Sequence, residues 1–197
     1  MDQAIGRPSD EELLARAHGG DDRSFGELVS RWERPLFHFV YRMISRSEDA
    51  RDVCQETFLR VIAHADRFRP GAKFSTWMYQ IALNLCRDQA RKKRRWSLIL
   101  AEDAEPRDDS TTTSWTSSLE EPEAATEAKE RRTALLDALR EIPAEQREVV
   151  VLKEFEGLKF REIADILRCP ESTVKSRMYY GLTGLRHALE KRGIHGA

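Results

Sequence analysis

The sequence predicts an all-α protein of two small helical domains joined by a flexible acidic linker. Apolar residues recur every three or four positions along most of the 197-residue chain, and no segment alternates as a half-buried strand does. Charge is segregated as well. Lys and Arg exceed Asp and Glu by 18 to 14 in residues 1–96 and by 14 to 11 in residues 128–197, whereas residues 97–127 hold one cation and nine acids. We therefore expect two mildly basic domains on either side of an acidic linker.

Two helices are expected before residue 45. Ser9 and Glu12 have the spacing of a capping box, which predicts the start of the first helix. The turn GGDD (19–22) separates it from a second helix. The apolar spacing of that helix continues past Pro35 to Ile44.

Two more helices complete the first domain. Ser47 is expected to begin the third, with acids in the first turn that suit the helix dipole. The segment RFRPGAK (67–73) ends it, and Ser75 or Thr76 is expected to begin the fourth. The apolar spacing predicts that the fourth helix buries one face: Trp77, Ile81 and Leu85.

The helical spacing of apolar residues is lost between residues 97 and 127. Acids and the hydroxyl-rich run DDSTTTSWTSS (108–118) predict a flexible linker there. Helical spacing resumes at Leu135, stops at Ile142-Pro143 and restarts at Val149. The second domain, 128–197, is thus also helical.

Residues 160–189 have the pattern of a helix-turn-helix. The first helix has an apolar inner face: Phe160, Ile163, Ala164 and Leu167. RCPE (168–171) makes the turn, with Pro170 expected in the first turn of the second helix. The second helix has an inward stripe with Leu182 at its edge: Val174, Met178, Leu185 and Leu189.

That stripe leaves hydroxyl, cationic and aromatic residues on outward or flanking positions: Ser172, Thr173, Lys175, Ser176, Tyr179 and Tyr180. Short hydroxyls near a helix N-terminus, followed by cations, suit phosphates and base edges in a major groove. The alternative is a solvated amphipathic helix in an ordinary bundle.

The fourth helix ends in a cluster of cations: Arg87, Arg91, Lys92, Lys93, Arg94 and Arg95. Aromatic residues precede the cluster: Phe68, Phe74, Trp77 and Tyr79. Cations at this density bind phosphates, and nearby aromatic rings can hold unstacked bases of single-stranded DNA. In the alternative interpretation, Phe74 and Trp77 are core residues and the cations lie on a solvated helix end.

Other classes of protein are disfavoured. No apolar run is long enough to span a membrane, the N-terminus has no export signal, and three widely spaced cysteines argue for a reducing cytoplasm. The five histidines have no metal-ligand spacing, and no glycine-rich phosphate loop or nucleophile motif occurs. We therefore expect no enzyme, no metal and no cofactor.

Three stretches resemble the extracytoplasmic-function sigma factors, the small two-domain promoter-recognition subunits of bacterial RNA polymerase. SEDARDVCQETFLRVI (47–62) resembles their polymerase-binding helix, and FSTWMYQIALNLCRDQARKKRR (74–95) resembles their promoter-melting helix. IPAEQREVVVLKEFEGLKFREIADILRCPESTVKSR (142–177) resembles their helix-turn-helix. A weaker match, FGELVSRWERPLFHFVYRMI (25–44), precedes them.

The resemblance implies that residues 1–96 bind core RNA polymerase and melt the promoter, while residues 128–197 read the minus-thirty-five element. It assigns these polymerase-binding residues: Asp49, Asp52, Gln55, Glu56, Phe58 and Leu59. Either Phe58 or Leu59 is expected to be a core residue instead. An anti-sigma factor is implied as a further partner.

The resemblance also assigns residues to the two promoter elements. Those for the minus-ten element are Phe68, Lys73, Phe74, Ser75, Asn84, Arg87, Arg91, Lys92, Arg94 and Arg95. Those for the minus-thirty-five element are Ser172, Thr173, Lys175, Ser176, Arg177, Tyr179 and Tyr180.

Two departures from the family pattern stand out. Tyr180, Gly181 and Leu182 replace the Arg-Ala-Arg that the family often has late in the recognition helix, which puts the usual minus-thirty-five preference in doubt. Lys159 also stands where Ser or Thr would cap the first helix opposite Glu162.

A free-standing helix-turn-helix regulator with an N-terminal sensor domain is the main alternative function. Such a protein has no evident need for the segment DVCQETFLRVI (52–62). The modest charge of each domain also predicts weak DNA binding without the polymerase.

Overall fold

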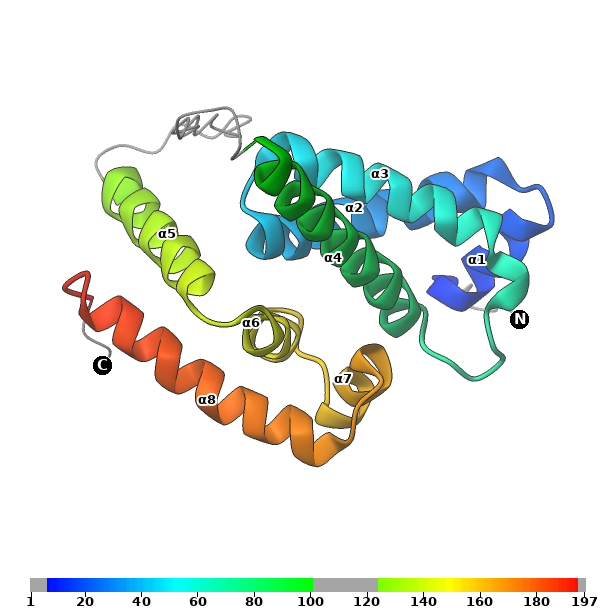
Figure 1. The fold of residues 1–197 in the computed structure, drawn as a ribbon. Coiled ribbons are helices and arrows are strands. Elements are labelled where there is room, and N and C mark those ends of the chain that lie inside the picture. The colour runs from blue at the N-terminus through cyan, green and yellow to red at the C-terminus, as the bar shows by residue number, and fades with distance from the viewer. Residues whose placement is uncertain (1–6, 101–123, 195–197) are drawn as a thin grey trace.

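The structure is a computed structural model, and it describes residues 7–100 and 124–194 (Figure 1). Every regular element within these ranges is a helix, so the all-α prediction is confirmed. The N-terminal half contains α1 (Asp10–His18), α2 (Asp22–Ile44), α3 (Ser47–Ala63), the short 3-10 helix η1 (Ala65–Arg67) and α4 (Phe74–Leu100). The C-terminal half contains α5 (Ala124–Glu141), α6 (Ala144–Val150), the π-helix η2 (Val151–Phe155), α7 (Phe160–Leu167) and α8 (Glu171–Glu190).

The predicted capping box at the start of α1 is present. The Glu12 N–H donates to the Ser9 hydroxyl at 3.2 Å, and the Ser9 N–H donates to the Glu12 carboxylate at 2.9 Å. As expected, α2 continues through Pro35 to Ile44 as one helix.

Three helix starts differ from the prediction. Ser47 is the first helical residue of α3 rather than its cap, because Arg46 occupies the cap position and makes no side-chain cap hydrogen bond. Helix α4 begins at Phe74, before Ser75 or Thr76, and the Phe74 N–H donates to the Glu11 carboxylate at 2.9 Å. Pro170 occupies the cap position just before α8 instead of its first turn.

Glu11 thus caps α4 from α1, and Glu11→Ala should lower the free energy of unfolding by about 1 kcal/mol. The Phe74 N–H lowers the pKa of Glu11 from its usual 4.5. Because the folded pKa lies below the unfolded one, this stabilisation is present above pH 4.5 and is lost as the pH falls through the lowered value. Urea unfolding at neutral and acidic pH measures both effects.

Glu11→Gln is the matched control, since its amide oxygen can still accept from Phe74 but carries no charge. It should lose less stability than Glu11→Ala and should lack the pH-dependent part. Equal stability of all three proteins at neutral pH would contradict the cap.

The buried face of α4 differs from the predicted one. Phe74, Met78 and Ala82 are fully buried and Leu85 nearly so, whereas Trp77 and Ile81 are half-buried. The cause is that α4 packs on α2 and α3 on one side and on α7 on the other. Its buried surface is therefore wider than the single stripe expected from spacing alone.

The helix-turn-helix prediction is confirmed by α7 and α8, which pack against each other. Val174, Met178 and Leu185 are buried, while Leu182 is 42 % exposed, as expected for the edge of the stripe. Lys159 takes the N-cap position of α7, where its N–H donates to Glu162 at 2.7 Å. In a capping box the side chain at the cap position also accepts a hydrogen bond from the N–H three residues later, here that of Glu162. The Lys159 ammonium cannot do so, because it has no acceptor atom.

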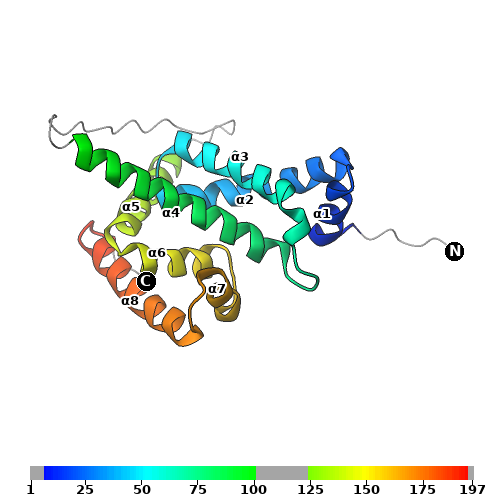
Figure 2. The ribbon, with the colours of Figure 1, turned by 45° about the vertical axis from the view of Figure 1, so that its right-hand side comes forward.

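The two halves pack together. Helix α4 contacts α7, and α2 contacts both η2 and α5. Figures 1 and 2 show α6 and α7 beside α4 from two directions. Helices α4 and α5 extend over residues 97–100 and 124–127 of the predicted linker, and its remaining residues, 101–123, lie outside the described residues.

Candidate polymerase and nucleic-acid interfaces

The outer face of α3 presents an exposed leucine among polar residues. Leu59 is 54 % exposed, and Gln55 and Asp52, one and two turns before it, are also exposed. Glu56 is half-buried and pairs with Arg60 at 2.7 Å. This face has the composition of a protein-binding surface, with one apolar anchor and acids around it.

Phe58 does not belong to this face. It is only 7 % exposed and lies in the hydrophobic core. Its predicted role as a surface anchor is therefore corrected: Phe58 is the core residue of the pair, and Leu59 is the one available to a partner. Asp49 is half-buried and pairs with Lys93 of α4 at 2.6 Å, which ties the start of α3 to the basic end of α4.

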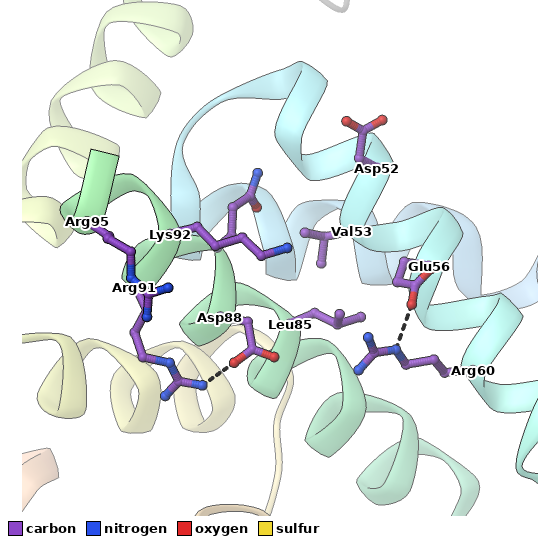
Figure 3. A pocket seen from close by; sticks show the side chains of 10 residues that line it. Asp52, Val53, Glu56, Arg60, Leu85, Asp88, Arg91, Lys92 and Arg95 are labelled. Carbon is purple, nitrogen blue, oxygen red and sulfur yellow. Dashed lines mark hydrogen bonds and ion pairs between the residues drawn. The ribbon is translucent and has the colours of Figure 1, made fainter. Parts of the chain in front are cut away.

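A shallow groove of about 490 Å³ separates the outer face of α3 from α4 (Figure 3). Its walls carry both signs of charge, with Asp52, Glu56 and Arg60 on α3 and cations of α4 opposite. Figure 3 shows Arg60 directed to Glu56 and Arg91 directed to Asp88 across neighbouring turns. Both pairs lie within one helix and join neighbouring turns, and neither bridges the groove.

The basic end of α4 is exposed. Arg91, Lys92, Arg94 and Arg95 all face solvent, and Trp96 beside them is 63 % exposed. Asn84, two turns before Arg91, is exposed as well. The cations of this stretch are accessible to phosphates, although Arg91 is paired with Asp88 of the turn before it.

The aromatic residues before this stretch are less available than expected. Phe74 is fully buried, and its ring centroid lies 5.9 Å from that of Trp32, so the core interpretation is the correct one for Phe74. Phe68 and Trp77 are half-buried and pack against each other with centroids 5.4 Å apart. Ser75 is also half-buried.

Two residues predicted to contact DNA form ion pairs with glutamates of the C-terminal half. Arg87 donates two hydrogen bonds to Glu148 of α6, Nε to Oε1 at 2.8 Å and Nη2 to Oε2 at 2.6 Å. The Lys73 Nζ lies 2.6 Å from Oε1 of Glu162 in α7. Sequence reasoning missed both acids as partners, because nothing local distinguishes them from solvated glutamates.

Five of the seven residues of α8 predicted to contact the minus-thirty-five element are exposed. Ser172, Lys175 and Ser176 are exposed, and Tyr179 and Tyr180 are 68 % and 60 % exposed. The two tyrosine rings meet edge to face, with centroids 5.4 Å apart.

Two other residues of α8 predicted to contact the minus-thirty-five element are less accessible to a partner. Thr173 is half-buried, and Arg177 is half-buried and pairs with Glu145 of α6 at 2.5 Å. Lys175 pairs with Glu171 one turn earlier at 2.7 Å. The exposed hydroxyls and rings therefore form the accessible part of this face.

The cysteines differ in accessibility. Cys54 and Cys86 are buried, and burial raises the pKa of each thiol to about 12, whereas Cys169 is half-buried. Since the thiolate is the reactive form, we expect Cys169 of the native protein to react readily with a disulfide reagent such as DTNB. Cys54 and Cys86 should react only when the protein unfolds.

Cys169→Ser is the control for this prediction and should remove the fast reaction. A second fast thiol in the native protein would contradict it. By the same reasoning, Cys54→Ser should respond to oxidants as the wild type does.

Within the described ranges, no His, Cys, Asp and Glu side chains form a group of three that fits a metal ion. None of the helices described is both long and apolar enough to span a bilayer.

Two family models match the chain. Sigma-70 region 2 matches residues 28–96, and Sigma-70, region 4 matches residues 132–183. The first match contains α3 and most of α4, and the second contains α6, α7 and the first half of α8.

Curated relatives match over nearly their whole length. The chain is 31 % identical over 184 residues to the RNA polymerase sigma-H factor of Pseudomonas aeruginosa, covering 92 % of this chain and 94 % of that one. It is 33 % identical over 182 residues to the ECF RNA polymerase sigma factor SigW of Bacillus subtilis, covering 91 % and 96 %.

The fold is also found among solved structures. The sigma factor RpoE of Bartonella quintana, solved with the anti-sigma factor NepR, matches with a TM-score of 0.68. That match covers 85 % of this chain and 98 % of that one at 23 % identity.

Proposed function

This chain belongs to the extracytoplasmic-function sigma factors, and on that premise we propose a division of labour among its three exposed helix faces. Helix α3 binds core RNA polymerase, the basic end of α4 holds the melted minus-ten element, and α8 reads the minus-thirty-five element as duplex. One observation carries the proposal: the exposed faces of α3, α4 and α8 all fall inside the two matched regions.

The polymerase contact is assigned to Leu59 with Asp52, Gln55 and Glu56 around it. A half-exposed leucine supplies apolar area, and the surrounding acids and amide fix its position against a basic partner. Asp49 contributes indirectly, since its ion pair with Lys93 fixes the start of α3.

The minus-ten contacts are assigned to the exposed stretch of α4: Asn84, Arg91, Lys92, Arg94 and Arg95. Cations along one helix can follow a single-stranded backbone, and the half-buried Phe68 and Trp77 border the loop where a flipped base would enter. Lys73 and Arg87 join this surface only after they leave their glutamate partners.

The minus-thirty-five contacts are assigned to Ser172, Lys175, Ser176, Tyr179 and Tyr180. Hydroxyls near the N-terminus of α8 suit phosphates and base edges, and tyrosine rings suit thymine methyl groups. The free-standing regulator is not favoured, because it gives no reason for the region 2 match over 28–96.

The remaining assignments follow from the family. A sigma factor is a transcription initiation factor, so we infer that this one has no catalytic activity and works where RNA polymerase is, in the cytoplasm. A related sigma factor was solved with an anti-sigma factor, and we infer a partner of that kind for this chain too.

Run-off transcription with purified core polymerase and a randomised promoter library tests the function. We expect transcription only when both proteins are present, with selection of two promoter elements. Replacing Lys175 and Ser176 with alanine should change the selected minus-thirty-five sequence, whereas Arg186→Ala, an exposed cation later on α8, should not. Absence of sigma-dependent transcripts, or an unaltered profile for the first variant, would refute the assignment.

A further inference from the structure

The outward face of α8 carries large apolar side chains that nothing in the chain covers. Tyr179, Tyr180 and Leu182 are exposed, and they are three of the five large hydrophobic residues exposed within residues 7–96 and 129–194. Exposed apolar side chains that cluster on one surface mark a contact with a partner. On a helix that enters a DNA groove, the partner of such a cluster must be an apolar group of the bases.

The three side chains extend across the width of the outward face. Successive residues of a helix are turned by about 100°, so Tyr180 and Leu182 lie on opposite flanks of Tyr179. Gly181, between them, lies against α6, where a Cβ would come within 2.8 Å of a Val150 methyl group. The two tyrosine rings also meet edge to face. The close crossing and the ring contact fix the direction in which the apolar groups face.

The cations of α8 are engaged by acids. The helix contains three Lys and Arg residues, and each of them pairs with a glutamate. The pairs are Lys175 with Glu171 at 2.7 Å, Arg177 with Glu145 of α6 at 2.5 Å, and Arg186 with Glu190 at 3.0 Å. Exposed pairs are weak enough to exchange for phosphates. An arginine or lysine that reads guanine must direct its donors to O6 and N7, and each of these cations would first have to leave its glutamate.

Two hydroxyls of the same face donate to the helix itself. The Ser176 hydroxyl donates to the Thr173 carbonyl at 3.0 Å, and the Thr183 hydroxyl donates to the Tyr179 carbonyl at 2.9 Å. Guanine presents only acceptors in the major groove, so hydroxyls whose protons are used in this way cannot donate to it. Their oxygens can still accept a hydrogen bond, for instance from the amino group of adenine.

From these features we propose that Tyr179, Tyr180 and Leu182 read thymine methyl groups, so that the minus-thirty-five element of this chain contains A·T pairs where these side chains meet it. The inference rests on the proposed function, in which α8 reads that element as duplex. The C5-methyl of thymine is the only methyl group that the four base pairs present in the major groove, and apolar side chains are its usual partners. Leu182 thereby becomes a specificity residue beside the two tyrosines.

The order of side chains along α8 sets the order of contacts in the element. The rise from Ser172 to Leu182 is about 15 Å, which corresponds to about four to five base-pair steps. Ser172 and Lys175 are at one end of this span, and the apolar side chains are at the other. We therefore expect the thymines to gather at one end of the element.

Deoxyuridine gives a direct test, because it pairs as thymine does but lacks the methyl group. Holoenzyme reconstituted from core polymerase and this chain is bound to the promoter that run-off transcription selects, at a low temperature that keeps the promoter duplex. Thymines of the minus-thirty-five element are replaced one at a time. Loss of a contacted methyl group should weaken binding about fourfold. Deoxyuridine in the spacer between the two promoter elements is the control and should leave the affinity unchanged.

A double substitution tests whether the side chains and the methyl groups act together. Tyr180→Ala with Leu182→Ala should bind the thymine promoter and its deoxyuridine forms alike wherever these two side chains make the contact. Both positions are exposed, so the fold should be unchanged, which circular dichroism checks. His187→Ala, at an exposed position later on α8, is the control and should lose affinity for deoxyuridine as the wild type does.

A change of specificity provides the converse test. Arginine can donate to O6 and N7 of guanine through two hydrogen bonds. Tyr180→Arg with Leu182→Arg should therefore select guanine from the randomised library at positions where the wild-type chain selects thymine.

Four results would overturn the inference. They are a selected element without thymine, equal affinity of the wild type for thymine and deoxyuridine promoters, an undiminished loss with deoxyuridine in the double-alanine variant, and continued selection of thymine by the arginine variant. Failure of the proposed function looks different, because replacing Lys175 and Ser176 would then leave the selected minus-thirty-five sequence unaltered. If those substitutions alter the sequence but deoxyuridine has no effect, α8 reads the element by another chemistry and only the present inference fails.

Discussion

Leu59→Arg is expected to weaken binding to core RNA polymerase by roughly 2 kcal/mol, about a thirtyfold loss of affinity, while leaving the fold unchanged. Leu59 is 54 % exposed, so the arginine meets solvent in the free protein and costs little. In the complex the same arginine would replace an apolar anchor and oppose a basic partner. Affinity is measured by fluorescence anisotropy with core polymerase, and folding by circular dichroism and urea unfolding.

A substitution at the neighbouring Phe58 should instead destabilise the fold. Phe58 is a core residue, and Phe58→Ala is expected to lower the free energy of unfolding by about 3–5 kcal/mol. Leu182→Arg provides the control for the change to arginine, because Leu182 is also a half-exposed leucine but lies on α8. It should leave polymerase affinity near the wild-type value. Unchanged affinity of Leu59→Arg would exclude the outer face of α3 from the polymerase contact.

The pair Phe58 and Leu59 also illustrates what sequence reasoning can establish. Apolar spacing predicts the helix and shows that one of two adjacent apolar residues points inward. It does not say which, because both fit a stripe when a helix packs on more than one neighbour. The structure decides the matter, since α3 packs on both α2 and α4.

The features predicted correctly from the sequence are those that depend on residues close together in the chain. The capping box at Ser9 and the helix-turn-helix of α7 and α8 rest on interactions within a few residues, and both are present. The start of α4 was predicted wrongly because its cap, Glu11, is 63 residues away in sequence. Arg87 and Glu148 are likewise 61 residues apart, and no local pattern reveals such a partner.

Gly181→Ala is expected to destabilise the C-terminal half by a net 1–2 kcal/mol, although alanine favours a helix by about 1 kcal/mol over glycine. Gly181 lies where α8 crosses α6, and a Cβ there would come within 2.8 Å of a Val150 methyl group and 3.3 Å of the Gln146 Cβ and carbonyl oxygen. Val150 is fully buried and β-branched, so it cannot move aside without strain. Thermal or urea unfolding measures the change.

Gly26→Ala supplies a control of opposite sign. Gly26 lies in α2 with nothing within 4 Å of the position a Cβ would take, so only helix propensity acts and stability should rise by roughly 0.5–1 kcal/mol. Combining Gly181→Ala with Val150→Ala should cost less than the sum of the two single changes, because the smaller side chain makes room for the new methyl group. If Gly181→Ala instead stabilised the protein as Gly26→Ala does, the close crossing of α6 and α8 would have to be abandoned, and with it the geometry that brings Glu148 to Arg87.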